Sequence, residues 1–239
     1  MDIVNAALTG KDMNLRKGTQ LAVFFEEDIP AIKNRDQDRF INEAACFAAA
    51  NNVFLVPGLY IKENYLCLCL IDNTGCVIGE QRATHLNSAW FDGLNRSLDI
   101  NIIGTSFGKL FLCPDVDIYK PEVLRIAALL GAEIVVSSQY IAASDFRKEM
   151  VLAGAWQQAQ QNCLYIINST NITGSIIGPC TVVEDLSGMM AGASTKTPLY
   201  AELSAAKRKQ AYDAFPIFKS LNIKLYKNHL KQLCEGCKK

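Results

Sequence analysis

The sequence has no surplus of charge of either sign. Its 24 lysines and arginines are balanced by 24 aspartates and glutamates, and there are only two histidines. Proteins that bind nucleic acids usually carry a basic face, so this composition does not favour a nucleic-acid partner. The one basic cluster, Lys207–Lys209, is more typical of a solvated helix face.

Long hydrophobic runs and export signals are also missing. No apolar run approaches the roughly 20 residues of a membrane-spanning helix. The opening residues, MDIVNAALTGKDMNLRKG, lack the basic-then-apolar order of a signal peptide. We therefore expect a cytoplasmic protein without a membrane partner. No low-complexity linker divides the chain, so we expect one domain over residues 1–239.

The nine cysteines do not suggest disulfide pairing. Their number is odd and their spacing irregular, so we expect free thiols. Five of them lie in apolar segments and are predicted to be small core residues: Cys46, Cys67, Cys69, Cys163 and Cys180. Cys234 and Cys237 form a single CEGC, which supplies only two of the four ligands of a closed zinc site. We therefore expect no metal and no organic cofactor.

Strand-like and helix-like segments alternate along the chain. The run QLAVFFEE is apolar throughout, as in a strand buried on both faces, and DRFINEAACFAAANN has helical spacing. In KPEVLRIAALLGAEIVVSS, Pro121 fits the first turn of a helix and Gly131 fits its end before a strand. DNTG and GPCTVVEDLSGMMAGAS predict hairpins, and AELSAAKRKQAYDAF predicts a last helix. The pattern indicates an α/β fold with some antiparallel pairing.

Two residues at predicted strand ends are candidates for chemistry. Cys113 ends the strand KLFLC before a turn and a helix, and Glu26 ends the strand LAVFFE. A thiol beside a carboxylate is a nucleophile–base pair suited to acyl transfer. Taken alone, each residue is more often structural than catalytic.

The order of the motifs resembles the nitrilase superfamily of carbon–nitrogen hydrolases over nearly the whole chain. VFFEE is similar to a first motif that ends Phe-Pro-Glu, and GEQRATHL to a second that ends Arg-Lys-Thr-His-Leu. FGKLFLCPD resembles a third motif, an apolar strand ending Cys-x-Asp or Cys-x-Glu. GAEIVVSS, AQQNCLYIINSTN, GPCTVVEDLSG and LYAELS resemble later landmarks. The resemblance implies a four-layer αββα sandwich, a glutamate base at Glu26, a cysteine nucleophile at Cys113 and a lysine at the position of Ala83.

The chain departs from this pattern at the residues that would stabilise an oxyanion. Ala83 carries no ammonium group, and Pro114, which follows Cys113, has no backbone N–H. Losing one oxyanion donor typically costs about a hundred- to a thousandfold in rate. Arg82 is adjacent, but neighbours on a strand point to opposite faces, so it should point away from the site. We expect His85 to have a structural role.

Two further departures concern length. Family members open with a strand and a long helix before the glutamate strand, whereas ALTGKDMNLRKG is not a convincing helix, so we expect a shortened N-terminal part. The spacing from Cys113 to the KPE that starts at Lys120 is also longer than the resemblance implies.

Two kinds of function remain open on the sequence. One is a thiol hydrolase for non-peptide C–N bonds of small amides or nitriles, impaired or altered by Ala83 and Pro114, with an N-acyltransferase as a variant. The other is a catalytically silent binding or scaffold protein on the same fold. The resemblance also implies a homodimer, with VLAGAWQQAQ and its Trp156 as a candidate contact helix.

Overall fold

The computed structural model describes residues 3–194, 197–225 and 227–229, and it contains two β-sheets. The first sheet has the order β13-β1-β2-β3-β5-β4, with β6 also paired to β5. Its strands are β1 (Ile3–Thr9), β2 (Leu21–Phe24), β3 (Phe54–Val56), β4 (Tyr60–Lys62), β5 (Tyr65–Ile71), β6 (Val77–Arg82) and β13 (Leu199–Ser204). The second sheet has the order β12-β11-β10-β9-β8-β7. Its strands are β7 (Ile102–Thr105), β8 (Gly108–Pro114), β9 (Ile134–Gln139), β10 (Tyr165–Thr170), β11 (Gly174–Ile177) and β12 (Met189–Ser194).

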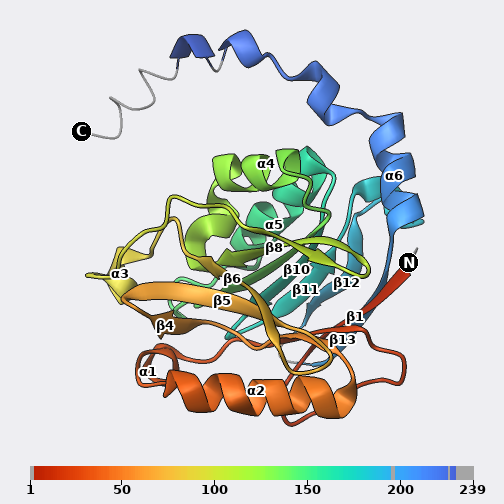
Figure 1. Ribbon diagram of the computed structural model, residues 1–239. Coiled ribbons are helices and arrows are strands. Elements are labelled where there is room, and N and C mark those ends of the chain that lie inside the picture. Colours follow the sequence, from red (N-terminus) through yellow and green to blue (C-terminus); the bar gives the residue numbers. More distant parts are fainter. Residues whose placement is uncertain (1–2, 195–196, 226, 230–239) are drawn as a thin grey trace.

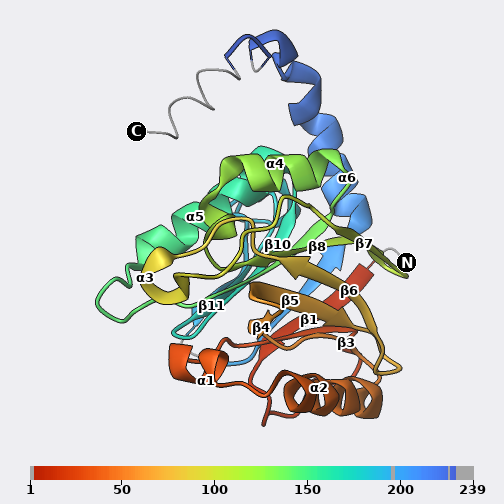
Figure 2. The same ribbon diagram turned by 60° about the vertical axis from the view of Figure 1, so that its left-hand side comes forward.

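Helices cover the outer faces of both sheets (Figures 1 and 2). The first sheet is covered by α2 (Gln37–Asn51), with the short α1 (Ile29–Lys33) beside it. The second sheet is covered by α4 (Pro121–Leu129) and α5 (Lys148–Asn162). The remaining helical elements are α3 (Ser88–Phe91), α6 (Ala205–Ala214) and the 3-10 turns η1 (Asp115–Tyr119), η2 (Cys180–Val182) and η3 (Ile217–Ser220). The expected four-layer αββα sandwich is confirmed.

Three apolar clusters hold the layers together, and alternation along each strand divides its residues between them. The cluster between the two sheets includes Leu8, Val23, Leu112, Val136 and Ile167. The cluster under α4 and α5 includes Phe111, Cys113, Val135, Ala155 and Ala159. The cluster under α2 includes Ala22, Leu55, Ala44 and Ala48. β2 is buried along its whole length and is apolar throughout, as the sequence indicated.

The N-terminal part is shortened as expected, but it contains a strand that the sequence did not suggest. β1 pairs in parallel with β2, and residues 10–20 connect the two without a helix. On its other side, β1 pairs antiparallel with β13, from Ile3↔Ser204 to Leu8↔Leu199. The predicted last helix is therefore wrong in its first residues, because AELS belongs to β13 and α6 begins at Ala205.

The predicted hairpins have mixed outcomes. The DNTG turn joins β5 and β6, and the Asp72 carboxylate accepts from the Thr74 and Cys76 backbone amides at 2.9 Å each. GPCTVVEDLSGMMAGAS is not a hairpin by itself: it holds η2 and then β12, which pairs with the earlier strand β11.

Two of the five cysteines predicted to be core residues are not in the core, because Cys46 is exposed and Cys180 is half-buried. CEGC lies outside the described residues. No described helix has the length and apolar character needed to span a membrane.

Candidate active site

The candidate site lies where the carboxyl ends of parallel strands from both sheets meet. Glu26 follows β2 of the first sheet, and its backbone N–H donates to the Ser169 hydroxyl on β10 of the second, at 3.0 Å. The Ser138 hydroxyl on β9 donates to Glu26 Oε2 at 2.6 Å. Ser138 lies two residues after Val136 on β9, and Ser169 lies two residues after Ile167 on β10. Because side chains alternate along a strand, both serines face the space between the sheets. The glutamate is thus fixed between the two sheets.

Glu26 is 1 % exposed, and its carboxylate is held by donors on both oxygens. Besides Ser138, the Leu59 amide donates to Oε2 at 2.7 Å, and the Glu27 amide donates to Oε1 at 2.9 Å. Burial raises the pKa of Glu26, and these donors together with the nearby Arg35 charge oppose the shift. Gly58 has φ +117°, and a Cβ there would lie 3.1 Å from both carboxylate oxygens, so glycine is required at this approach.

The structure does not bring Cys113 to Glu26. Along β8, Leu110 and Leu112 pack between the sheets, whereas Phe111 and Cys113 pack against α4 and α5. The Cys113 side chain is fully buried on the helix-covered face, opposite the face that Glu26 occupies. Burial, followed by the charges of Asp117 and Asp115, raises the thiol pKa well above its ordinary value. The thiol is therefore neither exposed nor activated.

Polar residues of three further strands continue in register beside Cys113 on this helix-covered face. Cys113 pairs with Ser137, Ser137 with Asn168, and Asn168 with Ser175. Within the described residues, Asn168 Nδ2 and Ser175 Oγ are buried without a hydrogen-bond partner, whereas the Ser137 hydroxyl interacts with the Cys113 thiol and opposes the rise in its pKa. Buried polar groups in this state usually bind internal water, so Cys113 belongs to a polar row in the packing layer rather than to the glutamate site.

The residue at the turn between β8 and η1 is Asp115. It has φ +48°, an uncommon conformation for a non-glycine residue, and its side chain is completely buried. A strained strand-to-helix turn of this kind is the geometry that presents a nucleophile at a sheet edge. The Asn87 amide donates to Asp115 Oδ2 at 3.1 Å, whereas Oδ1 is buried without a partner among the described residues.

Burial raises the pKa of Asp115 to about 7. The backbone amides of Asn87 and Val116 oppose the shift, whereas the charges of Asp117 and Glu26 reinforce it. Asp115 directly follows Pro114, which pairs with Ser138 in the second sheet, and the Ser138 hydroxyl donates to Glu26. The register therefore brings the two carboxyl groups to one end of the sheet, in agreement with the Glu26 charge raising the pKa of Asp115.

Asp115 was missed by the sequence analysis, although one signal pointed to it. Asp115-Val116-Asp117 fits the third motif with aspartate in place of cysteine, and the turn lies two residues nearer to Pro121 than Cys113 does. The long spacing after Cys113 was this signal. At this register the residue after the turn is Val116, which has a backbone N–H, so Pro114 removes no donor from the site.

Asp117 joins the turn to the second motif. Its Oδ1 accepts from the Thr84 hydroxyl at 2.7 Å and the His85 amide at 2.9 Å, and its Oδ2 accepts from the Thr84 amide at 2.8 Å. His85 Nδ1 lies 2.9 Å from the same carboxylate. These contacts give His85 the structural position that the sequence led us to expect.

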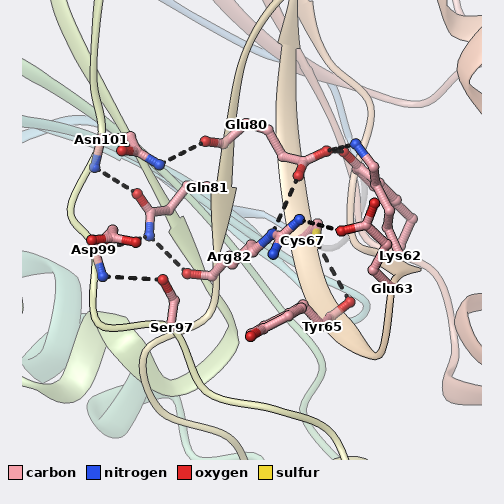
Figure 3. A network of polar contacts seen from close by, with 11 residues as sticks. Lys62, Glu63, Tyr65, Cys67, Glu80, Gln81, Arg82, Ser97, Asp99 and Asn101 are labelled. Carbon is pink, nitrogen blue, oxygen red and sulfur yellow. Dashed lines mark hydrogen bonds and ion pairs between the residues drawn. The ribbon is translucent and has the colours of Figure 1, made fainter.

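Neither neighbour in the second motif supplies a cation to the site. Ala83 is fully buried in the cluster between the sheets. Arg82 points to the opposite face, where it bonds Glu63 at 2.6 Å, lies 3.7 Å from Glu80 and stacks over the ring of Tyr65 (Figure 3). Arg82 therefore points away from the site, as alternation along the strand predicted.

A cavity of about 370 Å³ lies on the α2 side of Glu26. It is lined by the connection after β1 and by aromatic residues, among them Phe24, Phe40 and Phe47, together with Glu26 itself. Asp115 is not among its lining residues, so the cavity reaches the site only from the glutamate side.

Solved structures with the same architecture are known. The chain is similar to a carbon–nitrogen hydrolase from Helicobacter pylori G27, with a TM-score of 0.77, 18 % identity and coverage of 96 % of this chain and 99 % of that one. It is similar to Saccharomyces cerevisiae Nit3, of branch 10 of the nitrilase superfamily, with a TM-score of 0.74, 15 % identity and coverage of 92 % and 96 %. It is also similar to a mutant of the Nesterenkonia AN1 amidase, with a TM-score of 0.71, 14 % identity and coverage of 94 % of this chain and 96 % of that one. No protein-family model and no curated protein matches the sequence. The two sheets, their helix layers and these similarities together establish that the chain has the fold of the carbon–nitrogen hydrolases of the nitrilase superfamily.

Proposed function

We propose that this nitrilase-fold chain is a binding protein that does not hydrolyse C–N bonds through a cysteine acyl-enzyme. The observation that carries the proposal is the position of Cys113, which packs under α4 and α5 while Glu26 lies between the sheets. A base must lie within hydrogen-bond reach of the proton it removes. Glu26 therefore has no cysteine to activate at this sheet edge.

The residue at the turn supports the same proposal. One solved mutant of the Nesterenkonia amidase shows covalent addition of the acetamide moiety of fluoroacetamide at its active-site cysteine. In this chain the strained turn carries Asp115, a carboxyl group whose burial raises its pKa to about 7. A carboxylate is a weaker nucleophile than a thiolate toward an amide carbon, and Ala83 offers no ammonium to an oxyanion. The hydrolase and N-acyltransferase hypotheses both need the missing thiolate.

The test is a panel of small amides and nitriles with detection of released ammonia. We expect no turnover above the uncatalysed rate for the native chain, and no change in the Cys113→Ala variant. The matched control is an active nitrilase-superfamily amidase assayed under the same conditions. Turnover by the native chain that disappears in Cys113→Ala would contradict the proposal.

We further propose that two copies of the chain associate through the outer faces of α4 and α5. Large apolar side chains are exposed there: Ile126, Leu129 and Leu130 at α4, and Met150 and Trp156 on α5. α4 and α5 pack against each other, and exposed apolar side chains on neighbouring helices commonly mark an interface.

Sedimentation velocity tests the association. We expect a dimer for the native chain and a monomer for Ile126→Glu combined with Leu129→Glu. Leu98→Glu is the control, since Leu98 is 97 % exposed and belongs to neither of these helices. A native monomer, or a dimer unaffected by the double substitution, would contradict this interface.

A further inference from the structure

Two buried carboxyl groups lie on either side of Ser138: Glu26 accepts from its hydroxyl, and Asp115 follows Pro114, which pairs with Ser138 in the second sheet. Only Glu26 has a hydrogen-bond donor on both carboxylate oxygens. Glu26 accepts from Leu59, Glu27 and Ser138. Asp115 accepts from Asn87 through Oδ2, while its Oδ1 is buried without a partner among the described residues. An unpaired oxygen on a completely buried carboxyl group is costly unless a donor reaches it.

The cations near this pair are engaged elsewhere. The Arg35 guanidinium attracts Glu26, but it bonds the Leu59 carbonyl and the Glu27 carboxylate. Arg82 lies on the other face of the first sheet with Glu63. His85 bonds Asp117 rather than Asp115. Among the described residues, no cationic side chain bonds either carboxylate, and two buried carboxylates in this state favour the uptake of positive charge.

We propose that the Glu26–Asp115 site binds the ammonium group of a small primary amine, with Asp115 Oδ1 as its anchoring acceptor. An ammonium group has three N–H donors and a full positive charge, so it both fills the unpaired acceptor and neutralises the pair. A metal ion fits less well, because the described residues contain no group of three or more His, Cys, Asp or Glu side chains placed to hold one. This inference rests on the proposed binding function and names its ligand class.

The test compares n-propylammonium with n-propanol, which has a similar shape and no charge. Binding is measured by calorimetry and by the shift in Tm of the full chain at pH 8. We expect propylammonium to bind and raise Tm, and propanol to do neither. In Asp115→Asn the affinity should fall at least tenfold, whereas Asp213→Asn on the exposed face of α6 should leave it unchanged. Asp115→Asn keeps the shape of the side chain, and its fold is checked by its own Tm.

Affinity should also depend on pH, because a proton competes with the amine for Asp115. The titratable groups that interact with Asp115 are Glu26, Cys113, Asp117 and Tyr119. Raising the pH from 6 to 8 should strengthen amine binding severalfold in the native chain and leave Asp115→Asn unchanged.

Three outcomes would overturn the inference: no binding of propylammonium, equal binding of propanol, or a Tm increase by Mg²⁺ or Zn²⁺ alone that depends on Asp115. Each is distinguishable from failure of the proposed function, which the amide panel tests separately. If the chain turns over no amide and also binds no amine, the amine-binding inference is refuted and the proposal that the chain does not hydrolyse C–N bonds stands.

Discussion

Cys113 in the native protein is expected to react with iodoacetamide at least about a thousandfold more slowly than Cys46 and Cys76. The latter two are exposed, whereas Cys113 is fully buried on a central strand of the second sheet. Reaction at Cys113 requires local opening, and an opening free energy of only about 4 kcal/mol already slows labelling a thousandfold. Its raised pKa reduces the reactive thiolate further.

Peptide mapping by mass spectrometry after timed labelling at neutral pH measures the three rates in one sample. Labelling in guanidinium chloride is the control, because the rates should converge once the chain is unfolded. If native Cys113 reacts as fast as Cys46 or faster, its thiol is accessible and activated, and the hydrolase hypothesis regains its nucleophile.

Asp115→Asn is expected to stabilise the protein at pH 8 by up to a few kcal/mol. The folded-state pKa of Asp115 is about 7, above the ordinary value of 3.8. Between these values the folded chain keeps a proton that the unfolded chain has released, so native stability falls as pH rises from about 4 to 7. Above pH 7 the charge is buried in the folded chain, and this cost persists. Asparagine carries no charge and avoids it.

Urea unfolding at pH 5 and pH 8 measures this difference. The native chain and Asp115→Asn should be closer in stability at pH 5 than at pH 8. Asp117→Asn is a matched comparison on the same turn, and it should lose stability at both pH values because the Asp117 carboxylate accepts from Thr84 and His85. An Asp115→Asn variant that is less stable than the native chain at pH 8 would show that the buried charge is compensated.

The fold was predictable because its evidence is distributed along the chain. Apolar strand runs, the α2 and α4 helices and the DNTG turn each agree with the final elements. β1 was missed because IVNAALT borders polar sequence on one side and becomes a strand through its pairing with β2 and with the distant β13. The same pairing placed AELS in a strand where local propensity favoured a helix. The one-domain organisation and the cytoplasmic location stay predictions.

The candidate site was predictable only in part. Glu26 follows a strand that is strongly apolar, and Ala83 follows from its place in the second motif, so both could be identified as candidate positions from local sequence. Gly58, Ser138 and Ser169 approach Glu26 from other parts of the chain, and nothing local distinguishes them.

The sequence by itself determined the architecture, the position of Glu26 and the absence of a lysine at position 83. Only the tertiary structure decided that Asp115, rather than Cys113, is the strand-end residue that shares a site with Glu26. The physical reason is that KLFLC is apolar on both faces, because β8 is covered by the first sheet on one side and by helices on the other. A strand without polar alternation does not reveal which way each side chain points. The packing of Leu110 and Leu112 between the sheets turned Cys113 toward the helices, and the strained backbone at Asp115 set where the strand ends.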